Sequence, residues 1–257
     1  MKRYFDSAAC AAALGLSATL LAPLPAMAQS VLDASAAIEG STDIRDRGLS
    51  QTGGKAALSV DGTLPITSTL ILDGRAMTLR GSNRNGDSQF GLEIAPGLRT
   101  SSGGWTMNAG ARAHIYADAG ELDYVEIEGG LSRTLGPAWL KLGASYAPSQ
   151  DAIGGDNLHL SADAELGVPA TGFTLFAGVG RSWGSTKDNP VAAERAVRLR
   201  PDGDYTDYHV GIERSQLNVT YGLQYTDTTI DTSANRDSRY WDNDSGARVS
   251  GYFRVGF

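Results

Sequence analysis

The chain has 257 residues, with 22 lysines and arginines against 29 aspartates and glutamates, and a formal net charge of −7. This acidic balance argues against nucleic acid and against anionic lipid headgroups as partners that a basic surface would bind. The single cysteine is Cys10, so beyond it the sequence offers no disulfide, no thiolate metal site and no cysteine nucleophile.

The first predicted element is a secretory signal peptide, residues 1–28. Lys2 and Arg3 precede an apolar run over residues 8–24, and Ala26-Met27-Ala28 supplies the small residues that a signal peptidase reads. Cleavage after Ala28 predicts a mature domain of residues 29–257 with 20 bases and 28 acids. Past the signal, no apolar run approaches the roughly 20 residues of a spanning helix, so strands are expected to make any membrane crossing.

The mature sequence alternates apolar and polar residues along twelve segments. Residues 158–168 show the pattern most clearly, because Leu158 and Leu160 share one parity while His159 and Ser161 share the other. This period of two is typical of strands with an apolar environment on one face and water on the other. In chain order the predicted strands are residues 36–45, 56–66, 70–77, 90–94, 105–116, 125–131, 140–146, 158–168, 173–179, 208–213, 219–225 and 248–257.

The last predicted strand indicates which kind of sheet this is. Phe253, Val255 and the terminal Phe257 share its apolar face, while Arg248 and Arg254 lie on the other. An alternating strand that ends on an aromatic residue is typical of the closing strand of an outer-membrane β-barrel. In lipid such a sheet is stable only when its last strand pairs with its first, because every backbone polar group must be satisfied.

The connections between predicted strands also alternate in length. Those after odd-numbered strands are long (residues 47–54, 81–87, 118–121, 148–156, 184–204 and 227–246), and those after even-numbered strands span a few residues. Bacterial barrels have short periplasmic turns and longer external loops. The sequence therefore predicts an all-β, antiparallel, up-and-down transmembrane β-barrel of about 12 strands in the outer membrane of a Gram-negative cell, with candidate headgroup-level aromatics at Trp105, Trp139, Tyr146, Trp183, Tyr205 and Tyr225.

One short segment carries a family resemblance. Arg47-Gly48-Leu49-Ser50-Gln51, preceded by Thr42-Asp43 and followed by Lys55-Ala56, resembles the opening signature of the TorF porin family, also known as the gcw_chp family of bacterial outer-membrane proteins. The terminal Phe257 agrees with this resemblance. It implies an outer-membrane location and a diffusion-channel role.

The polar faces of the predicted strands would line the lumen, where function is expected. Many buried charges require pairing or hydration, and a barrel of twelve strands lies between the filled eight-stranded and the open sixteen-stranded forms. The pore-lining candidates are Glu39, Asp43, Arg45, Asp61, Asp73, Arg75, Glu93, Arg112, His114, Glu126, Glu128, Lys141, His159, Asp163, Glu165, Glu213, Arg248 and Arg254.

The first functional hypothesis is a porin for ions or small polar solutes, with weak cation preference from its acidic lumen. The alternatives are a non-conducting structural barrel, in which acids and bases neutralise one another, and an adhesin or receptor that acts through residues 184–204 or 227–246. The expected partners are outer-membrane lipid and lipopolysaccharide, the barrel-assembly machinery through the C-terminal strand, and small polar solutes or ions, with no nucleic acid.

Few residues of the sequence are candidates for catalysis or metal binding. A further alternative is an outer-membrane lipid hydrolase that uses His159, Ser161 and Asp163 on one strand face. A lipid hydrolase must present its nucleophile to lipid, but the parity of these residues points to the lumen and no group is identified to orient the base, so no enzyme activity is predicted. His114 and His209 lie on other strands than His159, so a metal site would need a long-range coincidence. No cofactor or metal is therefore predicted, and acids such as Asp204, Asp207 and Asp227 are interpreted as residues of solvated loops.

Overall fold

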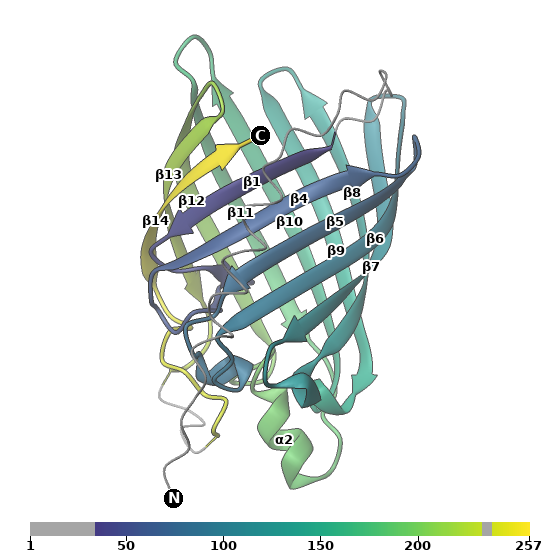
Figure 1. The fold of residues 1–257 in the computed structure, drawn as a ribbon, viewed down its shortest axis with the longest axis vertical. Helices are drawn as coiled ribbons and strands as arrows, with labels where there is room; N and C mark the ends of the chain where they lie inside the picture. Colours follow the sequence, from purple (N-terminus) through teal and green to yellow (C-terminus); the bar gives the residue numbers. More distant parts are fainter. Residues whose placement is uncertain (1–33, 233–237) are drawn as a thin grey trace, which may run out of the picture. The chain divides into compact units, whose positions relative to one another are not determined.

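The computed structural model describes residues 34–232 and 238–257, so the predicted signal peptide lies outside the described residues. These residues form a closed barrel of twelve antiparallel strands, in the order β1-β14-β13-β12-β11-β10-β9-β8-β7-β6-β5-β4 (Figure 1). The strands are β1 (Ser35–Ser41), β4 (Ala57–Pro65), β5 (Leu70–Thr78), β6 (Phe90–Ser102), β7 (Trp105–Tyr116), β8 (Tyr124–Leu135), β9 (Ala138–Gln150), β10 (Gly155–Val168), β11 (Phe173–Trp183), β12 (Tyr205–Gln216), β13 (Val219–Thr228) and β14 (Arg248–Gly256). The predicted strand number and closure are confirmed.

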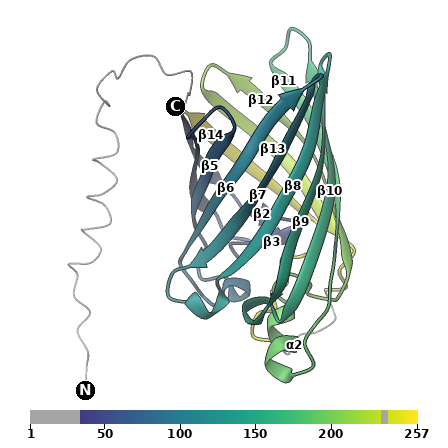
Figure 2. The ribbon, with the colours of Figure 1, turned by 90° about the vertical axis from the view of Figure 1, so that its right-hand side faces the viewer.

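The two faces of the barrel wall follow the alternation in the sequence. On β10 the side chains of Leu160 and Leu166 are exposed on the outside, whereas His159 is buried on the inside. The same holds around the barrel, where large apolar residues such as Leu58 and Val249 lie exposed on the outer face. An apolar surface of this extent is stable against hydrocarbon rather than water. The strands are tilted against the barrel axis (Figure 2), as closure of a sheet requires.

The connections divide between the two ends of the barrel as predicted. Short turns join β4–β5, β6–β7, β8–β9, β10–β11 and β12–β13 at the end where the carboxy-terminus lies, drawn at the top of Figure 1. The longer loops lie at the other end, and we call this the loop end. They contain the two-stranded β2–β3 (Arg45–Asp46 and Leu49–Ser50), the helical turns η1 (Asn83–Asn85), η2 (Gly120–Leu122) and η3 (Asp151–Ile153), and the helix α2 (Pro190–Ala196).

Helix α2 begins with a capped first turn. The Asn189 side chain accepts a hydrogen bond from the backbone N–H of Ala192, and Pro190 occupies the first helical position, where its missing N–H costs nothing. Among residues 34–232 and 238–257, no helix is long and apolar enough to cross a membrane.

Several element limits differ from the sequence-based prediction. β1 ends at Ser41, so Asp43 and Arg45 belong to the first long loop rather than to the barrel wall. β6 continues through Pro96 to Ser102, and its ladder with β7 is interrupted at that proline, which lacks a backbone donor. At the loop end β12 already begins at Tyr205 and β13 runs to Thr228, which moves Asp207 and Asp227 from loops into strands.

Two of the predicted headgroup-level aromatics lie elsewhere. Trp139 lines cavities inside the barrel, because it shares the inward parity of Lys141 on β9. Tyr205 is 1% exposed and packs with Leu49, Val197 and Trp241 among the loops. Both corrections show that an aromatic near a strand end does not by itself indicate the lipid face.

The long loops pack into a buried core of their own, which we call the plug. Arg198, 1% exposed, donates hydrogen bonds to the backbone oxygens of Arg84 at 2.9 Å, Leu122 at 2.9 Å and Ala152 at 2.6 Å. Arg84 in turn forms an ion pair with Asp242 at 3.0 Å. These residues come from five different loops.

The contacts of the plug extend across the mouth of the barrel. Arg84 follows β5 and Arg198 precedes β12, and these strands lie on opposite sides of the closed strand order. Their mutual contacts therefore span the loop end from one side to the other. Tyr116 and Tyr124 lie under the Arg198 guanidinium, with ring centroids 4.9 Å and 5.8 Å from it, and cation–π attraction adds to the hydrogen bonds.

Candidate functional site

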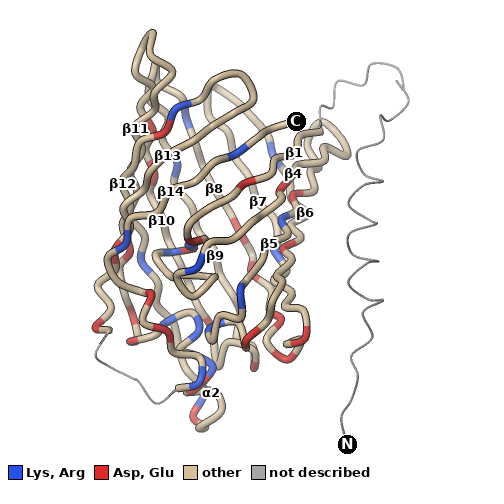
Figure 3. Tube along the Cα trace, turned by 60° about the vertical axis from the view of Figure 1, so that its left-hand side comes forward, with Lys and Arg blue, Asp and Glu red and all other residues tan. Residues whose placement is uncertain are grey.

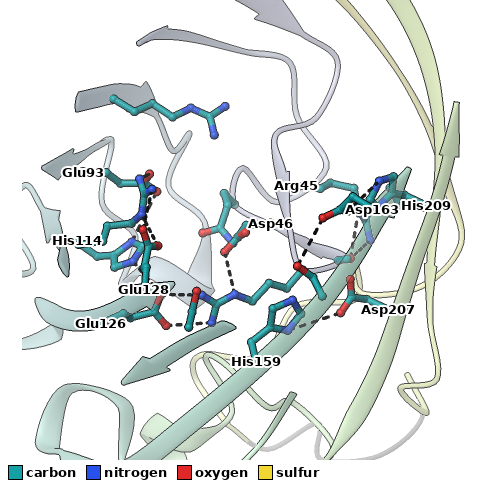
Figure 4. Close-up of a pocket in the computed structure, with 18 of the residues that line it drawn as sticks. Arg45, Asp46, Glu93, His114, Glu126, Glu128, His159, Asp163, Asp207 and His209 are labelled. Atoms are coloured by element: carbon teal, nitrogen blue, oxygen red, sulfur yellow. Dashed lines mark hydrogen bonds and ion pairs between the residues drawn. The ribbon is translucent and has the colours of Figure 1, made fainter. Parts of the chain in front are cut away.

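The interior of the barrel contains space lined by charged side chains. Three cavities of about 410, 480 and 500 Å³ are bounded by inward residues of the strands, together with residues of the first long loop. Figure 4 shows the first of them, with carboxylates, imidazoles and guanidinium groups pointing into one space. Such a lining holds water or a polar solute rather than an apolar one.

A hairpin of the first long loop enters this space. β2 and β3 pair through Arg45 with Ser50 and Asp46 with Leu49, and Arg47-Gly48 forms the turn with φ angles of 51° and 74°. Two successive positive φ angles are the mark of a type I′ hairpin turn. At Gly48 a side chain is also excluded by packing, because a Cβ there would lie 2.5 Å from Thr228 Cγ2.

The tip of the hairpin is bound to the barrel wall. The Arg47 guanidinium donates to both carboxylate oxygens of Glu126 on β8, at 2.9 Å and 2.6 Å. The Tyr205 hydroxyl donates to the backbone oxygen of Arg47 at 3.0 Å. Glu126 is fully buried, so its charge depends on this bidentate pair for compensation.

The base of the hairpin is fixed by a second buried carboxylate. Asp43 accepts hydrogen bonds from Ser50 Oγ at 2.6 Å, Thr52 Oγ1 at 2.8 Å and Arg45 Nη1 at 3.1 Å. Three charge-assisted bonds to one buried carboxylate hold both arms of the loop together. The segment that resembles the family signature is therefore the hairpin inside the lumen.

On one side of the lumen every inward carboxylate has an arginine partner. We call this side the paired wall; it consists of the inward faces of β1 and β4–β8. Its ion pairs are Glu39–Arg254 (3.5 Å), Asp61–Arg254 (2.6 Å), Asp73–Arg99 (3.9 Å), Glu93–Arg112 (3.0 Å), Glu128–Arg112 (2.7 Å) and Glu126–Arg47 (2.6 Å). The charges of the paired wall therefore largely neutralise one another.

His114 adds to the paired wall. Its Nδ1 lies 3.5 Å from Glu93 and its Nε2 lies 3.4 Å from Glu126, and its ring stacks on Tyr124 with centroids 4.3 Å apart. The imidazole thus lies between two carboxylates that arginines already contact.

The opposite side carries carboxylates without such partners. We call it the open wall; it consists of the inward faces of β10–β12. In the described part of the chain none of its four carboxylates forms an ion pair with lysine or arginine: Asp163, Glu165, Asp207 and Glu213. Asp207 lies 3.8 Å from His159, Asp163 lies 3.8 Å from His209, and Glu213 accepts a hydrogen bond from Tyr252 at 2.6 Å.

Two bases of the same cavities are also without an ion pair among the described residues, Arg75 and Lys141. Figure 3 shows Lys and Arg as well as Asp and Glu positions along the strands of the barrel, in addition to those in the loops. With four carboxylates against two bases outside ion pairs, the field available to a solute in the lumen is negative.

The structure places most of the predicted lumen residues around these cavities. Sixteen of the eighteen line them, and the exceptions are Asp61, which contacts Arg254, and Arg248, which donates to the Gly54 backbone oxygen at 2.6 Å. Five acidic, basic or histidine residues that line the cavities are absent from the predicted set: Asp46, Arg47, Arg99, Asp207 and His209. Strand parity is the signal that indicates Arg99 and His209, whereas the positions of Asp46 and Arg47 depend on how the loop folds.

The geometry does not assemble the catalytic set considered from the sequence. His159 Nδ1 is hydrogen-bonded to Ser182 Oγ on β11 at 2.9 Å, not to Ser161. Ser161 donates instead to Asp163, at 3.5 Å. Among the described residues no group of three His, Cys, Asp or Glu side chains is close enough to enclose a metal ion.

Comparison with known proteins places this barrel among outer-membrane channels in fold. Residues 25–250 match the profile of a family described as a bacterial protein of unknown function (Gcw_chp). No curated protein sequence matches that of this chain.

Three solved structures share its architecture. A KdgM porin is 6% identical, covers 87% of this chain and 99% of its own, and has a TM-score of 0.53. A NanC porin is 10% identical over 86% and 97% of the two chains, with a TM-score of 0.52. An outer-membrane channel from Pseudomonas putida F1 is 12% identical over 92% and 100%, with a TM-score of 0.50. At these identities the likeness concerns the fold.

Proposed function

The chain belongs to the Gcw_chp family of bacterial proteins of unknown function, and we propose that it is a porin-like channel of the outer membrane through which ions or small polar solutes diffuse, with preference for cations. The open wall carries this proposal. Its four carboxylates lack lysine or arginine partners and border cavities of about 410 and 480 Å³. Carboxylates that face a wet lumen attract cations and repel anions.

Other observations support the same reading. The similar folds include proteins named as porins and an outer-membrane channel, and the predicted signal peptide agrees with export. The segment that resembles the TorF signature forms the hairpin whose Arg47 lines the cavity of about 410 Å³. We propose further that the apolar outer face contacts lipid and lipopolysaccharide, and that β14 is the strand that the barrel-assembly machinery recognises.

The proposal is tested by conductance in planar bilayers. The protein would be isolated from outer membranes after expression of the full chain and recorded under a salt gradient. We expect discrete conductance steps and a reversal potential of the sign that cation preference gives. In the double variant Asp163→Asn/Glu165→Gln the reversal potential should move toward zero. The matched control Asp73→Asn/Arg99→Gln removes one charge of each sign from the paired wall and should keep the reversal potential.

A second function is favoured by the plug. Its buried arginines join five loops across the mouth of the barrel, which suits a closed barrel that acts through its loops. The variant Arg84→Ala removes the ion pair with Asp242 and should loosen the plug. A folded wild type that never conducts, together with a variant that never conducts, would favour this second function. Conductance that rises in the variant would support a channel limited by its plug.

A further inference from the structure

Two of the charged cavities, of about 410 and 480 Å³, meet inside the barrel. The residues that border both of them are Arg45, Arg75, Asp163, His209 and Gln224, and we call this set the junction. They come from the hairpin and from the strands β5, β10, β12 and β13, so a solute that moves from one cavity to the other passes between them. Cavities of this size are typical of sites for small molecules.

A base and an acid stand on nearly opposite sides of the junction. Arg75 lies on β5 and Asp163 on β10, and these strands are separated by five ladders of the closed barrel in one direction and by seven in the other. Both side chains border the same space, yet within the described part of the chain they form no ion pair with each other. Opposite charges that the wall holds apart attract the two ends of a solute that carries both signs.

Arg75 is the base of the junction that remains available to a solute. Arg45 donates to Asp43 at 3.1 Å and to the Gly246 backbone oxygen at 3.0 Å, so its charge is already compensated. Arg75 donates to Ser59 Oγ at 3.4 Å, and its Nε is buried without a hydrogen-bond partner among residues 34–232 and 238–257. A guanidinium group favours a carboxylate, which accepts two parallel hydrogen bonds from it.

The opposite side of the junction offers acceptors for a cationic group. Asp163 accepts a hydrogen bond from Ser161 at 3.5 Å and lies 3.8 Å from His209 Nε2, and Figure 4 shows the carboxylate beside the imidazole. Farther along the same cavity Asp207 is 6% exposed, and its Oδ2 has no hydrogen-bond partner among the residues that the structure describes. A buried acceptor without a donor is costly, and an ammonium group brings three donors.

A glycine keeps the Asp163 carboxylate open to the lumen. Gly178 on β11 pairs with Asp163 on one side and with His209 on the other. A Cβ on Gly178 would lie 2.4 Å from Asp163 Oδ1, so the carboxylate lies over β11 where a side chain would otherwise stand. β11 is six ladders from β5 in either direction, which places this carboxylate across the lumen from Arg75.

We propose that the junction is a binding site for small zwitterions, in which Arg75 binds a carboxylate and Asp163 binds an ammonium group. The inference rests on the proposed function, because it names the class of polar solute that the channel would pass. A cation or an anion of the same size pairs with one of the two side chains and leaves the other without a partner. A zwitterion pairs with both and adds no net charge to the lumen.

Binding is measured on the folded barrel in detergent by saturation-transfer NMR titration with γ-aminobutyrate. Butylammonium, butyrate and neutral butyramide have the same four-carbon chain but lack one charge or both. We expect γ-aminobutyrate to bind at least about tenfold more tightly than each of them, because each loses one charge-assisted hydrogen-bonding group or two. Equal binding of γ-aminobutyrate and butylammonium, or of γ-aminobutyrate and butyrate, would overturn the proposal.

Single substitutions separate the two ends of the site. Arg75→Gln should weaken the binding of γ-aminobutyrate and butyrate about tenfold without weakening that of butylammonium. Asp163→Asn should weaken the binding of γ-aminobutyrate and butylammonium without weakening that of butyrate. Heat-modifiable mobility in gels verifies that each variant is folded. A folded variant that loses both one-charge analogues equally would contradict the assigned ends.

A matched pair of double variants controls for the loss of charge. Arg75→Gln/Asp163→Asn removes one charge of each sign from the junction. Asp73→Asn/Arg99→Gln also removes one charge of each sign, but from residues that line the cavity of about 500 Å³ and not the junction. The first variant should lose the preference for γ-aminobutyrate over butyramide, and the second should keep it. Equal loss in both would overturn the proposal.

Current recording in planar bilayers separates this inference from the diffusion function. In the wild type γ-aminobutyrate should interrupt the ion current, and in Arg75→Gln/Asp163→Asn it should do so less. A barrel that binds γ-aminobutyrate but never conducts would support the site and refute the channel function. A barrel that conducts but binds γ-aminobutyrate no better than butyramide would refute the site alone.

Discussion

The paired wall and the open wall use the same acidic residue types in one lumen, yet they are built for different tasks. On the paired wall Arg112 contacts both Glu93 and Glu128, and Arg254 contacts both Glu39 and Asp61. On the open wall the described carboxylates have only imidazole or hydroxyl partners. This difference indicates that acidic residues inside the barrel are available to a solute only where no arginine contacts them.

Strand composition explains how the two walls arise. Arg112 lies on β7 between β6 and β8, so its guanidinium reaches carboxylates on both neighbours. The corresponding central strand of the open wall, β11, presents Gly178 and Gly180 to the lumen. With no long basic side chain there, the acids of β10 and β12 keep their charge unneutralised.

The largest effect is expected where the paired wall is buried. Arg47→Ala leaves Glu126 without its bidentate partner, and removal of one member of a buried ion pair costs about 3–5 kcal/mol. We expect a lower midpoint in urea unfolding and freer access of solute past the hairpin, measured as higher single-channel conductance. The control Lys141→Gln, a base without an ion pair, should unfold like the wild type. Equal destabilisation of both variants would break the distinction between the walls.

A smaller loss of stability is expected from a substitution that makes the paired wall resemble the open wall. Arg254→Gln frees Glu39 and Asp61, so the paired wall becomes locally similar to the open wall. The Arg254 side chain is 37% exposed, so solvent screening limits the loss of stability to about 1 kcal/mol. Cation preference should rise, which is opposite in direction to the effect expected of Asp163→Asn/Glu165→Gln. Reversal potentials under one salt gradient measure both, and a shift of the two variants in the same direction would contradict the assignment.

The weakest ion pair of the paired wall should matter little. Arg99 and Asp73 are 3.9 Å apart, with side chains 48% and 33% exposed. The double variant Asp73→Asn/Arg99→Gln should cost less than about 1 kcal/mol, measured by the urea midpoint. A larger loss would show that the paired wall acts as one network rather than as separate pairs.

The smallest effect lies outside both walls, at the loop end. The hydrogen bond from Lys187, 2.6 Å from Asp151, lowers the pKa of that carboxyl below its ordinary value of 3.8. A lowered folded-state pKa gives stability that is present above the unfolded pKa and is lost as the pH falls through the folded one. Asp151→Asn should therefore speed amide hydrogen exchange of residues 185–189 at neutral pH. At strongly acidic pH the variant and the wild type should exchange alike.

The sequence predicts the wall of this barrel well because lipid and water act on adjacent residues. At Leu158 and His159, or Leu140 and Lys141, the face of each side chain follows from parity alone. Parity predicts the third strand less clearly, because Ile71 and Met77 are apolar but face inward, where Met77 packs in the plug core. The parity rule assumes that every inward residue faces water, so it cannot predict an inward residue that is apolar.

The site itself depended on contacts between distant parts of the chain. Arg47 meets Glu126 across 79 residues of sequence, and no local pattern shows that the hairpin turns inward. Closure also brings the three histidines, which the sequence places on separate strands, to one cavity: His114, His159 and His209. The apolar pattern predicts that this strand begins at Tyr208, whereas β12 begins three residues earlier, so Asp207 lies in the strand and not in a loop.

The pairing of β1 with β14 closes the barrel, and we call it the seam. Its place in the chain affects the order of folding steps. β1 and β14 close the cylinder through five residue pairs, from Ala37–Gly256 to Ser41–Tyr252, fewer than any other ladder of the described barrel. Every other ladder joins strands that are neighbours in sequence, apart from the two elements of the hairpin. This one joins the first and last strands of the described barrel and carries the largest loop-closure entropy. We therefore expect seam formation to be the slow, final step of folding. Until then, the edge strands β1 and β14 of the membrane-inserted hairpins would stay unpaired.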